Sequence, residues 1–99
     1  MCGIYVTNIP YSKEEVESKL KSIYFRGPNN IGIEKIDELT LGHLRLSILD
    51  LEKRSNQPYN FGKYTIVYNG EIYNYKQIQS ELVSLGYHFE TTSDTEVLI

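Results

Sequence analysis

The stretch LTLGHLRLSI, residues 39–48, decides the fold of this 99-residue chain. From Leu44 onward, apolar residues alternate with Arg45 and Ser47. This period of two predicts a half-buried strand, with the leucines on one face and His43, Arg45 and Ser47 on the other. The strand therefore brings a guanidinium group and an imidazole to one polar face.

Further strands are predicted on both sides of this stretch. Residues 2–7 form a β-prone run at the N-terminus. Residues 64–68 form another, entered through a turn at residues 60–63 and left through Asn69-Gly70, a strong turn signal. Residues 31–36 and 87–89 are weaker strand candidates, and residues 29–30 and 52–60 are interpreted as polar loops.

Three capping signals predict helices. They are Ser12 with Glu15 before a helix over residues 13–24, Asn74 with Gln77, and Ser93 with Glu96. Gly86 supplies a left-handed end for the second helix. The third begins within two turns of residue 99, and so short a helix is marginal alone. We therefore expect the chain to be a fragment, of α+β class with a mixed or antiparallel sheet and two to three helices.

Composition limits the function classes. With 40% hydrophobic and 23% charged residues, the chain is typical of one small globular domain. A net charge of −3 argues against a nucleic-acid partner. No apolar run approaches the roughly 20 residues that cross a bilayer, and no signal peptide is evident, so we expect a cytoplasmic protein. The single cysteine excludes an internal disulfide and a multi-thiolate metal site, and we expect no metal.

Cys2 is the most informative position. Removal of Met1, which occurs when the second residue is small, would make Cys2 the N-terminal residue. The pKa of a free α-amine, roughly 7.7–8.0, lies close to that of a thiol at about 8.5. The terminal amine can then act as general base for the thiol of its own residue. The alternative is a thiol that is simply buried in the first strand.

Other residues offer complementary chemistry. Arg45 presents a planar fork suited to a carboxylate, although a surface salt bridge is the alternative. Asn69 and the Gly70 N–H provide two donors for a developing oxyanion, or else an ordinary turn. Glu71 and Asp94 together suit an ammonium group, although Asp94 alone also favours a helix dipole. The combination fits a zwitterionic amino acid whose side-chain carbonyl is attacked by a thiolate. His43 and His88, without evident partners, are interpreted as structural.

Six short blocks resemble the class II glutamine amidotransferase domain, and in particular the N-terminal part of glutamine-hydrolysing asparagine synthetases. The blocks are MCGI (1–4), RGP (26–28), GHLRLSILD (42–50), QP (57–58), NGEIYN (69–74) and SDTEV (93–97). They extend along the whole chain in the family's order. Two positions depart from the family pattern, since Phe25 and Asn29 stand where a histidine and an aspartate are usual.

The resemblance implies an N-terminal nucleophile hydrolase fold, an αββα sandwich of two antiparallel sheets flanked by helices. Residues 1–99 would form only the N-terminal portion of that domain. The synthetase domain, with its ATP and Mg²⁺, would be absent, so we expect no cofactor in this part. An incomplete sandwich exposes an apolar sheet face, and we expect self-association or a partner that covers it.

The resemblance also implies roles for individual residues. Cys2 would attack the side-chain amide of L-glutamine and form a thioester, while Asn69 and Gly70 stabilise the tetrahedral intermediate. The substrate-binding residues would be Arg45 for the carboxylate, Leu46, Ser47, Ile48 and Leu49 along the pocket, and Glu71 and Asp94 for the ammonium group. In the full-length enzyme the released ammonia would serve asparagine synthesis from aspartate and ATP.

Two alternatives remain at this point. The first alternative to an asparagine synthetase-type glutaminase is a non-catalytic module that binds glutamine or a protein. The second is the glutaminase part of an amidotransferase with another acceptor, such as a sugar or a natural product. The sequence does not separate asparagine synthesis from another acceptor, because the acceptor domain defines the product.

Overall fold

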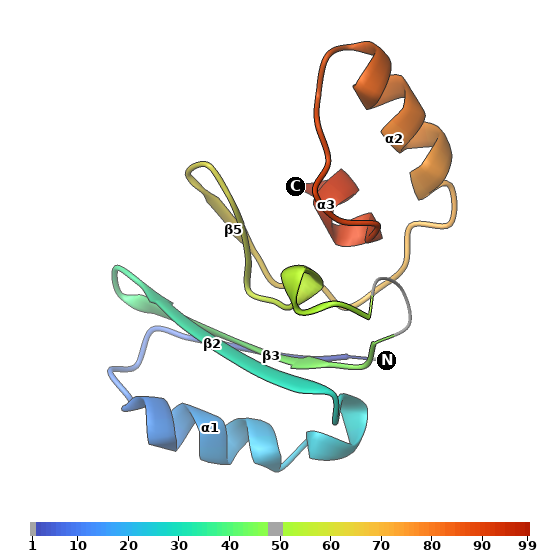
Figure 1. The fold of residues 1–99 in the computed structure, drawn as a ribbon. Helices are drawn as coiled ribbons and strands as arrows, with labels where there is room; N and C mark the ends of the chain where they lie inside the picture. The colour runs from blue at the N-terminus through green and yellow to red at the C-terminus, as the bar shows by residue number, and fades with distance from the viewer. Residues whose placement is uncertain (1, 48–50) are drawn as a thin grey trace.

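The computed structural model describes residues 2–47 and 51–99. These residues form a mixed α+β fold with antiparallel sheets and three α-helices, as the sequence predicts (Figure 1). The strands are β1 (Gly3–Thr7), β2 (Asn30–Ile36), β3 (Leu39–Arg45), β4 (Tyr59–Phe61) and β5 (Tyr64–Ile66), the α-helices are α1 (Lys13–Lys21), α2 (Tyr75–Ser84) and α3 (Asp94–Leu98), and short 3₁₀ helices span Tyr24–Arg26 and Lys53–Ser55.

A three-stranded antiparallel sheet in the order β1-β3-β2 carries α1 on one face (Figure 1). The core between them consists of Val16, Leu20 and Leu44, all fully buried. The predicted capping box is confirmed, because the Ser12 hydroxyl accepts from the Glu15 N–H and the Glu15 carboxylate accepts from the Ser12 N–H. The helix ends at Lys21, three residues before the predicted end, and a 3₁₀ turn follows.

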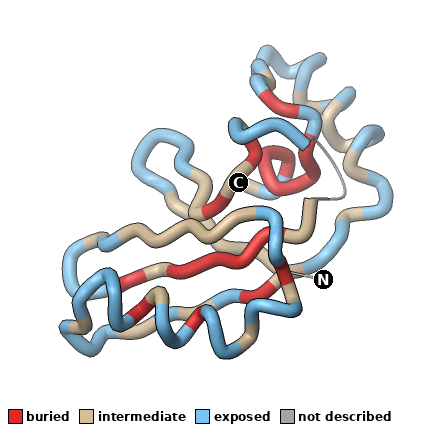
Figure 2. The backbone as a smooth tube through the Cα atoms, turned by 60° about the horizontal axis from the view of Figure 1, so that its bottom comes forward, coloured by how far each residue is buried: buried red, intermediate tan, exposed pale blue. Residues whose placement is uncertain are grey.

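Strand β3 is buried on both faces at its C-terminal end, rather than half-buried as predicted. Leu44 packs against α1, and the alternation of a strand places His43 and Arg45 on the opposite face. All three are buried, and Figure 2 shows a long buried stretch within the sheet. The prediction was wrong on burial because a second layer covers the polar face. The strand also ends at Arg45, and of the predicted stretch residue 48 lies outside the described residues.

That second layer is built on the β4–β5 hairpin. Residues 59–61 form β4, where the sequence was interpreted as loop and turn, and β5 ends at Ile66 instead of residue 68. Gly62, at φ +56°, makes the connecting turn. Residues 87–89 form no strand, and Asn69-Gly70 leaves β5 without returning into another strand.

A glycine joins the hairpin layer to the sheet. A Cβ built on Gly32 of β2 would lie 1.8 Å from the carbonyl oxygen of Gln57 and 3.0 Å from the Pro58 ring. The Gln57–Pro58 segment, whose peptide bond is cis, therefore rests directly on the backbone of β2. Nearby, the Asn60 amide donates to the Glu34 carboxylate at 2.9 Å. This contact between two backbone segments fixes how far the hairpin layer, which begins at Gln57, lies from the sheet.

Helices α2 and α3 pack against each other beyond the hairpin (Figure 1). Asn74 precedes α2 but makes no side-chain cap, whereas Gly86 has the predicted left-handed φ of +98°. Ser93 caps α3 as predicted by accepting from the Glu96 N–H. The Glu96 carboxylate does not complete a capping box, because it accepts instead from the backbone N–H groups of Glu90 and Thr91.

An apolar strip lies on the sheet face opposite α1. Ile4, Val6 and Leu39 are each about half exposed there, at 45%, 50% and 47%. That self-association or a partner covers this strip stays a prediction. Within the part of the chain that the structure describes, no helix has both the length and the apolar character needed to cross a membrane.

Candidate active site

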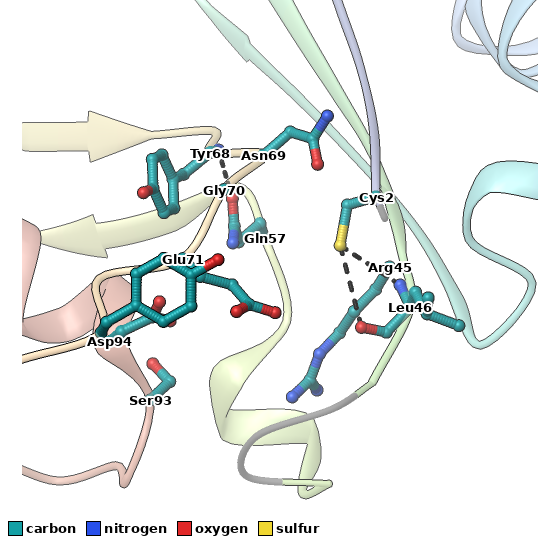
Figure 3. A pocket seen from close by; sticks show the side chains of 11 residues that line it. Cys2, Arg45, Leu46, Gln57, Tyr68, Asn69, Gly70, Glu71, Ser93 and Asp94 are labelled. Atoms are coloured by element: carbon teal, nitrogen blue, oxygen red, sulfur yellow. Dashed lines mark hydrogen bonds between the residues drawn. The ribbon is translucent and has the colours of Figure 1, made fainter. Parts of the chain in front are cut away.

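Most of the predicted site residues line one cavity of about 280 Å³, between the end of β3 and the segment that follows β5 (Figure 3). This volume suits a molecule of amino-acid size. Its lining residues are Cys2, Arg45, Leu46, Gln57, Tyr68, Asn69, Gly70, Glu71, Tyr73, Ser93 and Asp94. Residues separated by more than 90 positions in the sequence therefore share one pocket.

Cys2 enters the pocket just before β1. The backbone N–H of Leu46 donates to its Sγ at 3.3 Å, and the thiol lies 3.8 Å from the Leu46 carbonyl oxygen (Figure 3). On the main-chain side, Arg26 Nε donates to the Cys2 carbonyl at 3.1 Å. The Leu46 backbone therefore holds the sulfur on one side, and Arg26 fixes the main chain that carries it. The role of Arg26 was missed in the sequence, although it stands in the RGP block.

Asn69 and Gly70 face Cys2 across the cavity. Figure 3 shows the Asn69 side chain projecting toward the strand that carries the cysteine. Gly70 packs on the ring of Tyr68, because a Cβ at this position would lie 2.6 Å from the tyrosine hydroxyl. The segment is not a hairpin turn, because no strand follows it in the described part of the chain, and the predicted oxyanion role stays a prediction.

Arg45 is 5% exposed and reaches the pocket from β3. Its Nη1 donates at 2.8 Å to the Glu52 carbonyl and at 2.8 Å to the Asn56 side-chain oxygen. Both acceptors are neutral oxygens, and they hold the guanidinium at the wall of the cavity. The planar fork of a guanidinium group suits bidentate binding of a carboxylate.

The two acids differ in their surroundings. Glu71 is exposed at the rim, whereas Asp94 is 7% exposed and accepts from the Ile72 N–H at 2.9 Å. Both line the cavity on the side away from Cys2 (Figure 3). Asp94 therefore ties α3 to the Asn69–Ile72 segment and at the same time lines the cavity.

Part of the predicted lining lies elsewhere. The backbone N–H of Ser47 donates to Asn29 Oδ1 at 3.0 Å, and Ser47 is not among the lining residues. Ile48 and Leu49 lie outside the described residues. Asn29, which departs from the family pattern, thus accepts a bond that shapes the end of β3, while Phe25, the other departure, is 80% exposed.

Four lining residues carried no predicted role in the site. They are Gln57, Tyr68, Tyr73 and Ser93. Gln57 belongs to the QP block, and that block was the only sequence signal for it. Tyrosines at positions 68 and 73 could not be distinguished by pattern from the seven others in the chain.

His43 is fully buried beside Arg45 and does have a partner, contrary to the sequence interpretation. Its Nε2 lies 3.2 Å from the Tyr68 carbonyl oxygen, to which it donates. Burial lowers the pKa of His43 from 6.5 to about 4, although the bond to Tyr68 opposes this shift, and the Arg45 charge lowers the pKa further. The imidazole is therefore neutral at physiological pH, with its proton on Nε2.

This depressed pKa predicts acid sensitivity. Below pH 6.5 the unfolded chain protonates His43 before the folded chain does, so the stabilisation is present above pH 6.5 and is lost as pH falls through 4. The shift corresponds to about 3 kcal/mol. Urea unfolding at pH 7 and pH 4.5 should show that His43→Gln loses less free energy of unfolding than the unmodified chain. Equal losses in both would contradict the prediction.

An N-terminal strand that delivers Cys2 into a pocket of an antiparallel α+β fold is typical of a partial N-terminal nucleophile domain. Consistent with this class, a family model described as a glutamine amidotransferase domain matches residues 1–99. The chain therefore belongs to the glutamine amidotransferase domain family.

Curated relatives agree. The chain is 35% identical over 108 residues to glutamine-hydrolysing asparagine synthetase 3 of Bacillus subtilis (strain 168), covering 100% of this chain and 17% of the relative. It is 42% identical over 89 residues to asparagine synthetase 1 of that organism, covering 88% of this chain and 14% of the relative. It is 39% identical over 88 residues to amidase chyE of Penicillium rubens, covering 87% and 13%. The chain thus spans less than a fifth of these relatives.

Proposed function

We propose that this chain carries the glutaminase site of an asparagine synthetase-type amidotransferase. Cys2, exposed as the N-terminal residue once Met1 is removed, attacks the side-chain amide carbon of L-glutamine. Its α-amine takes the thiol proton and passes it to the leaving nitrogen, so ammonia departs and a thioester remains on Sγ. Water then hydrolyses the thioester to glutamate and regenerates the thiol.

The observation that carries this proposal is the facing pair of groups in the cavity. On one side of the cavity the Leu46 N–H donates to Cys2 Sγ, and on the other side lie Asn69 and Gly70. A carbonyl placed between them would have a nucleophile on one face and hydrogen-bond donors at its oxygen, which is the arrangement that stabilises a tetrahedral intermediate. Opposite charges at Arg45 and at Glu71 with Asp94 would take the two ends of the amino acid.

The relatives support the destination of the ammonia. Two of them are named as glutamine-hydrolysing asparagine synthetases, and in such an enzyme the ammonia would amidate aspartate with ATP and Mg²⁺ in a separate synthetase domain. Glutamine hydrolysis is the step that the 99 residues would contribute. We propose a cytoplasmic location for this chemistry.

Covalent labelling tests the proposal. The intact mass of the chain after exposure to 6-diazo-5-oxo-norleucine, a glutamine mimic that alkylates such nucleophiles, should show loss of Met1 and one adduct on Cys2. L-glutamine in excess should protect the thiol, and D-glutamine should not. Iodoacetamide serves as the control for simple thiol exposure. Labelling by iodoacetamide without labelling by the mimic, after Met1 removal, would contradict a glutamine-shaped site.

Arg45 supplies a second prediction. Lysine keeps the charge but not the planar fork, so Arg45→Lys should raise KM for glutamine about tenfold and leave kcat within about twofold. Lysine also loses the bonds to Glu52 and Asn56. Thermal unfolding of the variant therefore accompanies the kinetics. An unchanged KM in a folded variant would show that the guanidinium does not hold the substrate carboxylate.

A further inference from the structure

Both main-chain polar atoms of Tyr68 are held by buried side chains. The Tyr68 N–H donates to Gln57 Oε1 at 2.6 Å, and the Tyr68 carbonyl accepts from His43 Nε2 at 3.2 Å. His43 is fully buried and Gln57 is 7% exposed. The two side chains come from different layers, His43 from the sheet and Gln57 from the segment before the hairpin.

Holding these two atoms fixes the direction of the chain into the oxyanion segment. The Tyr68 carbonyl and the Asn69 N–H belong to one planar peptide unit, and the Tyr68 N–H belongs to the preceding one. With both units anchored, the φ and ψ angles of Tyr68 have little freedom. The Cα of Asn69, and with it the side chain that faces Cys2, is then placed relative to β3, the strand whose end contacts the thiol.

Each anchor is itself anchored. Gln57 Nε2 donates to Thr95 Oγ1 on α3 at 3.2 Å, and the Gln57 backbone rests on Gly32 of β2. Gly32 lies directly opposite His43 in the register of the sheet. One of the two side chains that bind Tyr68 therefore comes from β3, and the other comes from a segment that rests on the residue paired with His43 in β2.

We propose that His43 and Gln57 are positioning residues for the glutaminase reaction: together they clamp Tyr68 and thereby aim Asn69 and Gly70 at the oxyanion formed on the Cys2 adduct. The inference rests on the proposed function. Oxyanion donors act in the transition state more than in substrate binding, and a misplacement of about 1 Å can cost on the order of 100-fold in rate. Loosening the clamp should therefore lower kcat and spare KM.

His43→Leu removes the donor at similar volume, whereas His43→Gln returns an N–H near the position of Nε2. Thr65→Val is the matched control, because the Thr65 hydroxyl donates to Asn60 within the hairpin and takes no part in the two hydrogen bonds that hold Tyr68. We expect His43→Leu to lower kcat between about tenfold and a hundredfold with KM within about twofold. His43→Gln should recover most of the rate, and Thr65→Val should match the unmodified chain. Rates are normalised to the fraction of chain that the glutamine mimic alkylates, which removes any contribution from unfolded protein.

Amide hydrogen exchange reads the clamp without turnover. The Tyr68 amide should exchange at least about tenfold faster in His43→Leu and in Gln57→Met, with the Leu20 amide in α1 unchanged. The proposal is overturned if the Tyr68 amide exchanges at an unaltered rate in these variants. It is also overturned if His43→Leu raises KM by the same factor as it lowers kcat, or if kcat is as low in His43→Gln as in His43→Leu. If the unmodified chain neither hydrolyses glutamine nor reacts with the mimic, the proposed function fails, and exchange alone decides whether the clamp exists.

Discussion

Replacing Cys2 by alanine is expected to abolish glutamine hydrolysis, with a loss in kcat of at least roughly ten-thousand-fold, as for other catalytic nucleophiles. The reason is that the thiol forms the covalent intermediate, and no other cysteine is present to replace it. Alanine is also small enough for Met1 to be removed, so the α-amine remains available. The measurement is ammonia release from L-glutamine by the purified variant.

The fold should survive this change, because Cys2 is only half-buried and lies outside the core of Val16, Leu20 and Leu44. Unfolding temperatures of the two proteins should agree within a few degrees. Cys2→Ser provides a graded comparison, since it keeps a hydroxyl in place of the stronger thiolate nucleophile. Substantial hydrolysis by a well-folded Cys2→Ala protein would exclude Cys2 as the nucleophile.

Replacing Gly32 by alanine is expected to cause a large loss of stability, about 3 kcal/mol in the free energy of unfolding. The new methyl would lie 1.8 Å from the carbonyl oxygen of Gln57 and 2.8 Å from its carbonyl carbon, and both of these are backbone atoms. Strand β2 cannot shift without loss of hydrogen bonds to β3, and Gln57 cannot shift without loss of its hydrogen bonds to Tyr68 and Thr95. Activity should fall with stability, because Gln57 would be lifted away from Tyr68.

Gly42→Ala is the matched control for this prediction. Gly42 lies in the same sheet, but its added methyl would meet the side chain of Leu20 at 2.8 Å, and a side chain can shift. We expect a loss of about 1 kcal/mol there, measured by urea unfolding of both variants. A Gly32→Ala protein as stable as Gly42→Ala would mean that the Gln57 segment is not seated on β2.

Local signals in the sequence predicted the elements well where the cause is local. The Ser12 and Ser93 caps depend on hydrogen bonds within one helical turn, and Gly86 depends on its own φ angle, so each is readable over a few residues. Element ends were less predictable. The helix after Ser12 ends at Lys21, and the chain then turns so that Arg26 donates to the Cys2 carbonyl. Cys2 is distant in the sequence, so the residues around Lys21 do not indicate this end.

The candidate site follows the same division. Cys2, Arg45, Asn69, Glu71 and Asp94 were selected from the chemistry of their side chains and Gly70 from its backbone N–H, and the cavity includes all six. His43 and Gln57 could not be assigned from sequence, because what they hold is the backbone of Tyr68. Backbone N–H and C=O groups are the same in nearly every residue, so the residue types at positions 43, 57 and 68 do not indicate this interaction.

The sequence by itself determined the class of fold, the family and the set of reactive groups, because periodicity, caps and motif blocks act over short separations in the chain. Only the tertiary structure decided which of these groups meet. The seating of Gln57 on Gly32 and the pairing of β1 with β3 bring together residues 2, 45, 57, 69 and 94, and such contacts arise from packing between layers. The polar face of β3 became a buried wall for the same physical reason.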